Sequence, residues 1–319
     1  MQVDHVVRLG GKINMKSITK SLISIVSDLD GVPSGAYNIR EDGECASRHS
    51  SKNIEIRPKE DKSGIDIIIK DNTKGETVYI PALVTHENVK DIVYNDFYVG
   101  EGADVIISAG CGIHNDGCGT SEHNGIHRFF IKKNARVIYE EKHVGTGNGE
   151  GKKIINPETY VEIDEDGYME MNTVQIGGVD STKRECTAVL NNGAKLIVKE
   201  KIMTHGSQFA ETSFTVDLNG EDSGVNLISR SVAKENSKQR FVSKINGNNK
   251  CTGHSECDAI IMDNAIVTAI PEITANNVDA SLIHEAAIGK IAGDQIIKLM
   301  TLGLSEEEAE TRIVEGFME

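Results

Sequence analysis

The stretch Glu101-Gly-Ala-Asp-Val-Ile-Ile107 has a design that recurs along this chain of 319 residues. Each copy has Gly or Asn where a turn needs a positive φ, then Ala, and then a short apolar strand. The other copies are Lys133-Asn-Ala-Arg-Val-Ile-Tyr139, Asn192-Gly-Ala-Lys-Leu-Ile-Val198 and, more loosely, Asp263-Asn-Ala-Ile-Val-Thr-Ala269. Recurring units of turn and strand predict stacked β layers, as in a β-helix or a sandwich. The alternative is coincidence among common turn residues.

The sequence around these copies also indicates strands. Short runs rich in β-branched residues, bounded by Gly, Asn or Asp, lie at residues 65–69, 78–80, 105–107, 137–139 and 196–198. Few helical signals occur between residues 50 and 275. Before them, residues 18–29 fit an amphipathic helix with one apolar face, made of Ile18, Leu22, Ile25, Val26 and Leu29.

The end of the chain changes character. Residues 294–302 predict a helix that Gly303 ends. Ser305 and Glu308 form a capping-box pattern, and the helix that follows spaces Ala309, Ile313 and Phe317 four residues apart. This helical hairpin serves either as a cap over the core or as a docking surface. We therefore expect an N-terminal α/β region (1–75), a β core (76–275) and a C-terminal helical subdomain (276–319).

Composition narrows the function. The formal net charge of −15, without a Lys/Arg-rich run, excludes a chain built to bind nucleic acid. The apolar stretch at residues 18–29 is too short to span a membrane and carries Lys20 and Asp28. Without a secretion signal, we expect a cytoplasmic protein with reduced cysteines at positions 45, 111, 118, 186, 251 and 257.

Two clusters carry residues suited to metal or sulfur chemistry. The first is Cys111-Gly-Ile-His114-Asn-Asp-Gly-Cys118, followed by His123 and His127. Thiolates and imidazoles in a Gly-rich segment suit soft or borderline metals. The alternative is a polar loop whose histidines bond to backbone groups.

The second cluster is Cys251-Thr-Gly-His254-Ser-Glu-Cys257-Asp258, followed later by His284-Glu285. If residues 257–261 form a strand, Cys257 shares a face with Ala259 and Ile261, whereas Asp258 points the other way. Imidazole and carboxylate groups can complete a coordination shell or tune a thiolate. We interpret Cys45 and Cys186 as small hydrophobic residues.

The glycines of Val144-Gly-Thr-Gly-Asn-Gly149 resemble a phosphate loop, but the Gly-Lys-Ser/Thr ending is missing. We therefore expect no nucleotide on this chain.

Motifs in the last seventy residues resemble the SufB/SufD family in order and spacing. They are Gly253-His-Ser-Glu-Cys-Asp258, Ile270-Pro-Glu-Ile273, His284-Glu-Ala-Ala-Ile-Gly-Lys-Ile291, Asp294-Gln295 and Gly303-Leu-Ser-Glu-Glu-Glu-Ala309 through Gly316-Phe317. Upstream, Glu221-Asp-Ser-Gly224, Ser229-Arg-Ser231 and Gly110-Cys111 with Ile131-Lys-Lys-Asn-Ala135 are similar to further family segments.

The resemblance implies a right-handed parallel β-helix whose C-terminal helices dock a SufC-type ATPase. It also implies a scaffold rather than an enzyme, with ATP hydrolysis on the partner. Sulfur from a donor would arrive at Cys111 and pass to Cys257, where Cys257 with Glu285 or His284 would hold a transient iron–sulfur cluster for apo-protein acceptors. Ligand roles for Cys118, His114, His123 and His127 stay open beside these, as do the roles of Cys186 and Cys251.

The chain departs from the family pattern by being shorter than a typical SufB. We therefore expect a compact scaffold of an anaerobic or archaeal type, which forms a homodimer or a SufB/SufD-type heterodimer. The alternatives are a metal-dependent β-helix enzyme acting on an acidic polymer, which the charge of −15 disfavours, and a SufD-like structural partner without its own cluster.

Overall fold

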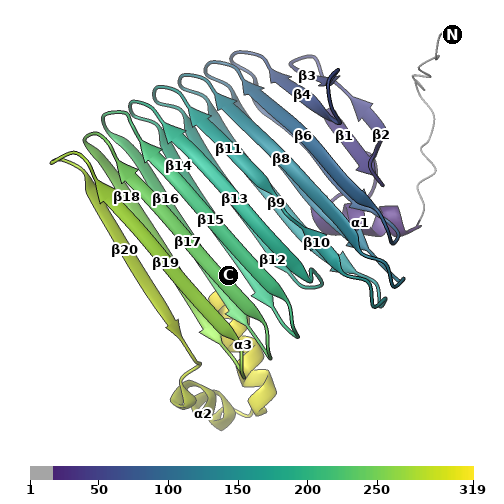
Figure 1. Ribbon diagram of the computed structural model, residues 1–319, viewed down its shortest axis with the longest axis vertical. Coiled ribbons are helices and arrows are strands. Elements are labelled where there is room, and N and C mark those ends of the chain that lie inside the picture. Colours follow the sequence, from purple (N-terminus) through teal and green to yellow (C-terminus); the bar gives the residue numbers. More distant parts are fainter. Residues whose placement is uncertain (1–16) are drawn as a thin grey trace.

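The computed structural model describes residues 17–319, and this part of the chain is mainly β, with 58% strand and three helices. The strands stack into a β-solenoid of about 8 turns, formed by two facing sheets (Figure 1). The predicted mainly β chain with a parallel β-helix core and short C-terminal helices is confirmed.

The first sheet has ten strands. In spatial order they are β2 (Glu44–His49), β1 (Ala36–Glu41), β5 (Lys74–Val84), β7 (Asp104–His114), β9 (Arg136–Thr146), β12 (Tyr168–Ile176), β14 (Lys195–Thr204), β16 (Ser223–Ala233), β18 (Cys251–Ile261) and β20 (Ser281–Gly289).

The second sheet faces the first. Its order is β19 (Ile266–Ala275), β17 (Lys238–Gly247), β15 (Phe209–Leu218), β13 (Ser181–Leu190), β10 (Lys153–Ile155), β8 (Ser121–Ile131), β6 (Lys90–Val99), β4 (Gly64–Ile69) and β3 (Ile54–Pro58), with β11 (Glu158–Ile163) also between β13 and β8.

From β5 onward the chain alternates between the two sheets, except that β10 and β11 follow each other in the second sheet, and strands one turn apart pair in parallel. Neighbours one turn apart are separated by 27 to 32 residues. Two antiparallel hairpins, β1–β2 and β3–β4, begin the stack. Because side chains alternate along a strand, one set from each sheet points into the space between the sheets.

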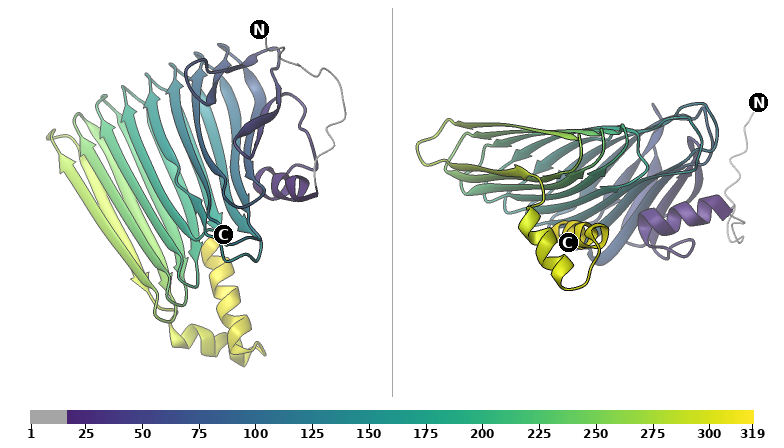
Figure 2. Two further views of the ribbon diagram at one scale, coloured as in Figure 1. Left: turned by 45° about the vertical axis from the view of Figure 1, so that its right-hand side comes forward. Right: turned by 90° about the horizontal axis from the view of Figure 1, so that it is seen from below.

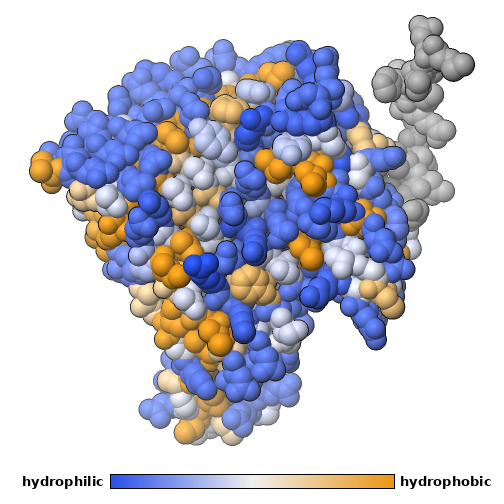
Figure 3. Space-filling model, in the orientation of Figure 1, coloured by the Kyte–Doolittle hydropathy of each residue, from blue (hydrophilic) through white to orange (hydrophobic). Residues whose placement is uncertain are grey.

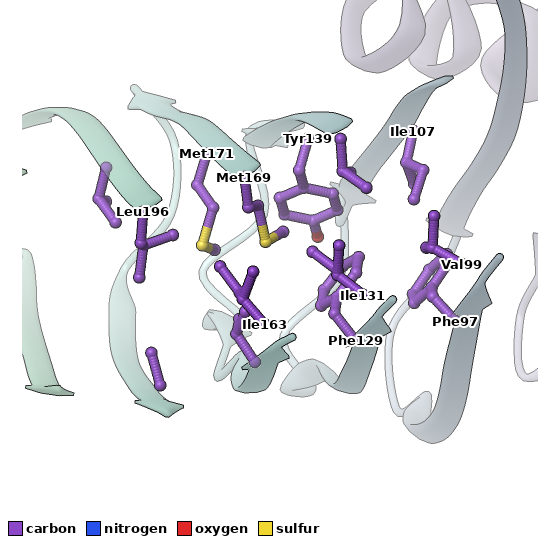
Figure 4. Close-up of a cluster of buried hydrophobic side chains, with 14 of the residues drawn as sticks. Phe97, Val99, Ile107, Phe129, Ile131, Tyr139, Ile163, Met169, Met171 and Leu196 are labelled. Carbon is purple, nitrogen blue, oxygen red and sulfur yellow. The ribbon is translucent and has the colours of Figure 1, made fainter. Parts of the chain in front are cut away.

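This inner space is the core. Phe97 and Phe129, one turn apart, stack with ring centroids 4.4 Å apart, and Tyr139 meets Phe129 from the other sheet at 5.0 Å. Figure 4 shows how aliphatic side chains and the methionines Met169 and Met171 continue this stack.

The repeated turns have the predicted conformation. Gly102, Asn134 and Gly193 adopt positive φ in the three close copies. In the looser copy the positive φ falls one residue earlier, at Asp263. Asn and Asp tolerate this region better than other side chains, which is why both recur at these turns.

One helix lies over the outer face of the first sheet. Helix α1 (Ser17–Ser27) buries Thr19, Leu22, Ile23 and Val26 against β5, β7 and β9. The predicted apolar face is wrong in part, because Ile18 and Ile25 are exposed and Leu29 follows the helix. The helix packs the side formed by Leu22, Ile23 and Val26 against the sheet, because Gly110 and Gly112 of β7 have no side chains and leave room there.

Two helices close the chain at one end of the stack (Figure 2). Helix α2 (Gly293–Thr301) ends before Gly303 at positive φ, and α3 (Glu306–Met318) begins with the predicted Ser305/Glu308 capping box. Val314 and Met318 of α3 pack against Val232 of β16.

The three-part division of the chain stays a prediction. Within it, residues 1–16 lie outside the described part, β1 to β4 precede residue 76, and β20 opens the stretch after residue 275. Among the described residues, no helix is both long and apolar enough to cross a membrane.

Candidate functional site

The inner space of the solenoid contains a buried polar cluster around Cys111. Cys111 lies on β7, and the register places it beside His143 of β9. His123 and His127 reach the same space from β8 of the facing sheet. All four side chains are buried.

His123 is held by a chain of ion pairs that runs through Asp91 to Arg40. Its Nδ1 donates to Asp91 Oδ2 at 2.9 Å, and Arg40 binds both oxygens of Asp91 at 2.8 and 2.6 Å. Burial acts against charge on His123, but the Cys111 charge and the Asp91 hydrogen bond raise its pKa to about 10. His123 is therefore an imidazolium at neutral pH, and Nε2 is the nitrogen left to face Cys111.

A second chain of ion pairs lies beside Cys111 in the first sheet. His143 Nε2 lies 3.2 Å from Glu141 Oε1, and Glu141 accepts from Arg184 at 2.6 Å and from the Tyr139 hydroxyl at 3.0 Å. Burial lowers the pKa of His143, and Glu141 raises it, to about 9. Arg184 Nη2 also lies 3.4 Å from His143 Nδ1.

These neighbours change the chemistry of Cys111. Burial alone would raise the pKa of its thiol, but the charges of His123 and His143 and their hydrogen bonds lower it to about 7. A thiol with such a pKa is about half thiolate at pH 7, and the thiolate is the form that attacks sulfane sulfur and binds metal. The sequence predicted Cys111 and His123 as site residues, and the structure brings them into contact.

The remaining members of the first predicted cluster lie in different places. His127 Nδ1 meets the Tyr139 hydroxyl at 2.9 Å, and burial lowers its pKa to about 4, so the ring is neutral. His114 lies on the face of β7 opposite Cys111 and contacts Thr146 and Asp116. Cys118 is exposed in the loop between β7 and β8.

The second predicted cluster divides between two faces of the first sheet. Cys257 points into the inner space, as does Ala259, and Asp258 points outward as predicted. His284 pairs with Ser255, so it lies on the inner face as a diagonal neighbour of Cys257. Glu285 lies on the outer face, and the structure does not bring it to Cys257.

The electrostatics at Cys257 differ from those at Cys111. Burial, reinforced by Glu200 and Asp258, raises the pKa of the Cys257 thiol to about 12. The inner-face nitrogen His284 Nδ1 is buried and has no hydrogen-bond partner in residues 17–319. A thiol and an unpartnered imidazole nitrogen suit iron, which would also favour the thiolate.

A row of buried polar groups joins the two cysteines. From Glu141 it continues through Arg184 to Glu200, whose carboxylate lies 3.7 Å from Arg184 Nε and accepts from Ser229 Oγ at 2.9 Å. Ser229 pairs with Cys257. Arg184 and Glu200 also line a small cavity with Thr173 and Thr212.

Sequence reasoning missed most of this row. Arg40, Asp91, Glu141, Arg184 and Glu200 were not singled out, and Cys186 was interpreted as a small hydrophobic residue. Cys186 is buried in the core, and burial raises its pKa to about 12, yet it faces the charges of Arg184, Glu141 and Glu200. One sequence signal could have revealed these residues: a charged residue two positions from an apolar residue of the same strand face. Glu141 follows Tyr139 in this way, and Arg184 precedes Cys186.

Comparison with known proteins adds a family. A family model described as "SUF system FeS cluster assembly, SufBD core domain" matches residues 87–317 of the chain. The chain is similar to an iron-sulfur cluster assembly SufBD family protein of Archaeoglobus fulgidus, with 31% identity over 261 residues, covering 82% of this chain and 69% of the relative.

Two further relatives carry the same family description. One from Methanocaldococcus jannaschii is 29% identical, covering 83% of this chain and 84% of the relative. One from Methanothermobacter thermautotrophicus is 28% identical, and there the alignment covers 73% of this chain but only 56% of the relative.

Proposed function

Because the chain belongs to the SufBD family of the SUF iron–sulfur cluster assembly system, we propose that it is a scaffold on which a cluster is built and from which it is handed on. The observation that carries the proposal is the Cys111 thiol, held at a pKa of about 7 inside the solenoid by His123 and His143. A family member with an activated buried thiol can accept sulfur and keep it away from water.

The first step is sulfur transfer. The Cys111 thiolate attacks the outer sulfur of a persulfide on the donor, a new S–S bond forms, and the donor cysteine leaves as a thiolate. No net oxidation occurs in this exchange. The charge of His123 lowers the pKa of the persulfide formed on Cys111 as it lowers that of the thiol.

The second step moves sulfur towards Cys257. The polar row of Glu141, Arg184, Glu200 and Ser229 supports a path for a polar sulfur species, because an apolar core would exclude it, and Arg184 is the cation of this row. Cys186 faces this row and would divide the path into two transfers. An external two-electron donor would then reduce the sulfane sulfur to sulfide, which Cys257 and His284, on the inner face of the last described turn, would hold together with iron.

Two surfaces in the C-terminal part of the chain support the proposed partners. The α2–α3 hairpin exposes Ile297, Met300 and Leu302, and Figure 3 shows apolar residues gathered over it, which supports its docking to a SufC-type ATPase. The last turn supports pairing with a second copy, as argued below. ATP hydrolysis on the partner would then rearrange the pair and open the buried Cys257. We place this assembly in the cytoplasm.

Anaerobic reconstitution with iron and sulfide tests the scaffold. We expect visible and Mössbauer signals of a cluster, lost in Cys257→Ala and weakened in His284→Ala. Cys45→Ala is the control, because Cys45 is an exposed cysteine on β2. A SufD-like partner without its own cluster would give no signal in any of these proteins, and this result would reject the proposal.

A further inference from the structure

Three side chains on the outer face of the first sheet form a ligand group apart from the inner cysteines. They are His254 and Glu256 on β18 and Glu285 on β20, and one ligand atom of each lies within 4.8 Å of the others. Within residues 17–319, no other group of three or more His, Cys, Asp or Glu residues meets this criterion. The pathway from Cys111 to Cys257 uses none of them.

The register explains why the three meet. His254 and Glu256 are two residues apart and share the outward direction. Glu256 pairs directly with Glu285 on the neighbouring strand. Each side chain is at least partly accessible to solvent. Because β20 is the last strand of this sheet in the described chain, the group also lies at an open edge.

The two carboxylates repel each other. Like charges directly opposite on adjacent strands are destabilising. In the part of the chain that the structure describes, neither glutamate forms an ion pair with Lys or Arg, and Glu285 Oε2 lies 3.6 Å from His254 Nε2. A bound cation would remove this repulsion.

His254 is oriented to be a ligand. Its Nδ1 lies 2.9 Å from Asn226 Oδ1 on β16, so Nδ1 carries the proton and donates to the amide oxygen. The lone pair of the neutral ring is then on Nε2, which faces the carboxylates. Metal-binding histidines typically donate their other nitrogen in this way.

We propose that His254, Glu256 and Glu285 bind a divalent transition-metal ion. One imidazole and two carboxylates suit Fe²⁺, Mn²⁺ or Zn²⁺ and leave coordination positions open, so the ion can leave again. That the ion is Fe²⁺ waiting to enter a cluster rests on the proposed function. The assignment also gives Glu285 a role on the face where it lies, opposite Cys257.

Anaerobic titration of the full chain with Co²⁺, and separately with Fe²⁺, tests the site. We expect one equivalent of Co²⁺ bound without a thiolate charge-transfer band. Affinity should fall at least tenfold in each of His254→Ala, Glu256→Gln and Glu285→Gln. Glu272→Gln is the control, because this glutamate on β19 is paired with Lys244. Unchanged binding in the triple variant overturns the site, as does binding that disappears in Cys257→Ser.

A stability readout separates the site from a merely structural role. Without metal, Glu285→Gln should raise the melting temperature by removing the repulsion, and it should abolish the rise that Co²⁺ causes in the wild type. A lower melting temperature in the metal-free variant contradicts the argument.

The metal site and the scaffold proposal can fail independently. If the metal ion binds but reconstitution yields no cluster, the scaffold proposal fails and the site stands. If clusters form but the ion binds elsewhere, the site fails and the scaffold stands.

Discussion

At the scale of single residues, Cys111 shows how neighbours reverse the effect of burial. Three of the buried thiols, at Cys186, Cys251 and Cys257, have raised pKa values, and Cys111 alone among the buried cysteines has a lowered one. The difference is the imidazolium of His123, fixed by Asp91 and Arg40. Burial makes such a pair strong, because little water screens it.

Replacing His123 tests this cause. In the wild type, the Cys111 thiolate should appear as the pH rises through about 7. In His123→Gln the positive charge is gone while burial remains, so the thiolate should appear only at higher pH. Ultraviolet absorbance near 240 nm, compared with Cys111→Ala, follows the thiolate. His49→Gln serves as control on an exposed histidine, and a midpoint still near 7 in His123→Gln would contradict the account.

At the scale of elements, glycines let α1 lie against the outer side of the strand that carries Cys111. A Cβ on Gly110 would lie 2.6 Å from the backbone oxygen of Val26 and 2.7 Å from its Cβ. The helix and the strand therefore approach closer than any other residue would allow.

Gly110→Ala should therefore destabilise the chain by about 1–3 kcal/mol, the usual cost of overpacking. Urea denaturation measures this change in the free energy of unfolding. Gly31→Ala is the matched control, since no atom lies within 4 Å of its added Cβ. Equal stabilities of the two variants would show that the helix moves away without cost.

The C-terminal hairpin carries the second prediction at this scale. Leu302→Asp places a charge on an apolar residue that is 73% exposed, so the fold should be kept while docking to a SufC-type ATPase is lost. Pull-down with the purified ATPase measures docking. Ile176→Asp, at an exposed position on β12, should bind as the wild type does. Full binding by Leu302→Asp would place the ATPase elsewhere.

Elements were predictable to a greater extent than the site. Turn residues and β-branched runs are local signals, and strands appeared where residues 65–69 and 196–198 predicted them. The site depends on contacts between distant residues: one turn of 32 residues brings Asp91 to His123, and the facing of the two sheets brings Glu141 to Arg184, 43 residues away. Glu285 shows where prediction from the sequence stops. Adjacent residues on a strand point to opposite faces, so only one residue of the His284-Glu285 pair can face Cys257, and the sequence does not say which one.

At the scale of the whole molecule, the solenoid ends with an open core. Ile273 and Ile288 occupy inner positions by register with Ile245 and Ala259, yet they are 43% and 38% exposed. No described strand pairs with the outer edges of β19 and β20. Exposed edges with apolar side chains favour pairing with another chain.

A second copy of this chain is the occupant we propose for this end. Ile273→Lys should shift a dimer to a monomer in sedimentation velocity, because the charge would be buried at the junction. Ile106→Lys, on the outer face of β7, should leave the dimer intact. If the wild type is a monomer and pairs only with a different SufBD chain, the homodimer proposal is wrong and the pair is a heterodimer.

Cluster transfer tests the central claim most directly, because a scaffold must release what it assembles. The measurement mixes the reconstituted full chain with an apo-ferredoxin, and circular dichroism follows cluster arrival on the acceptor, with and without the ATPase and ATP. The account predicts transfer from the wild type and from Cys45→Ala, and none from Cys257→Ala. A cluster that stays on the chain under all conditions, or transfer that does not require Cys257, would contradict it.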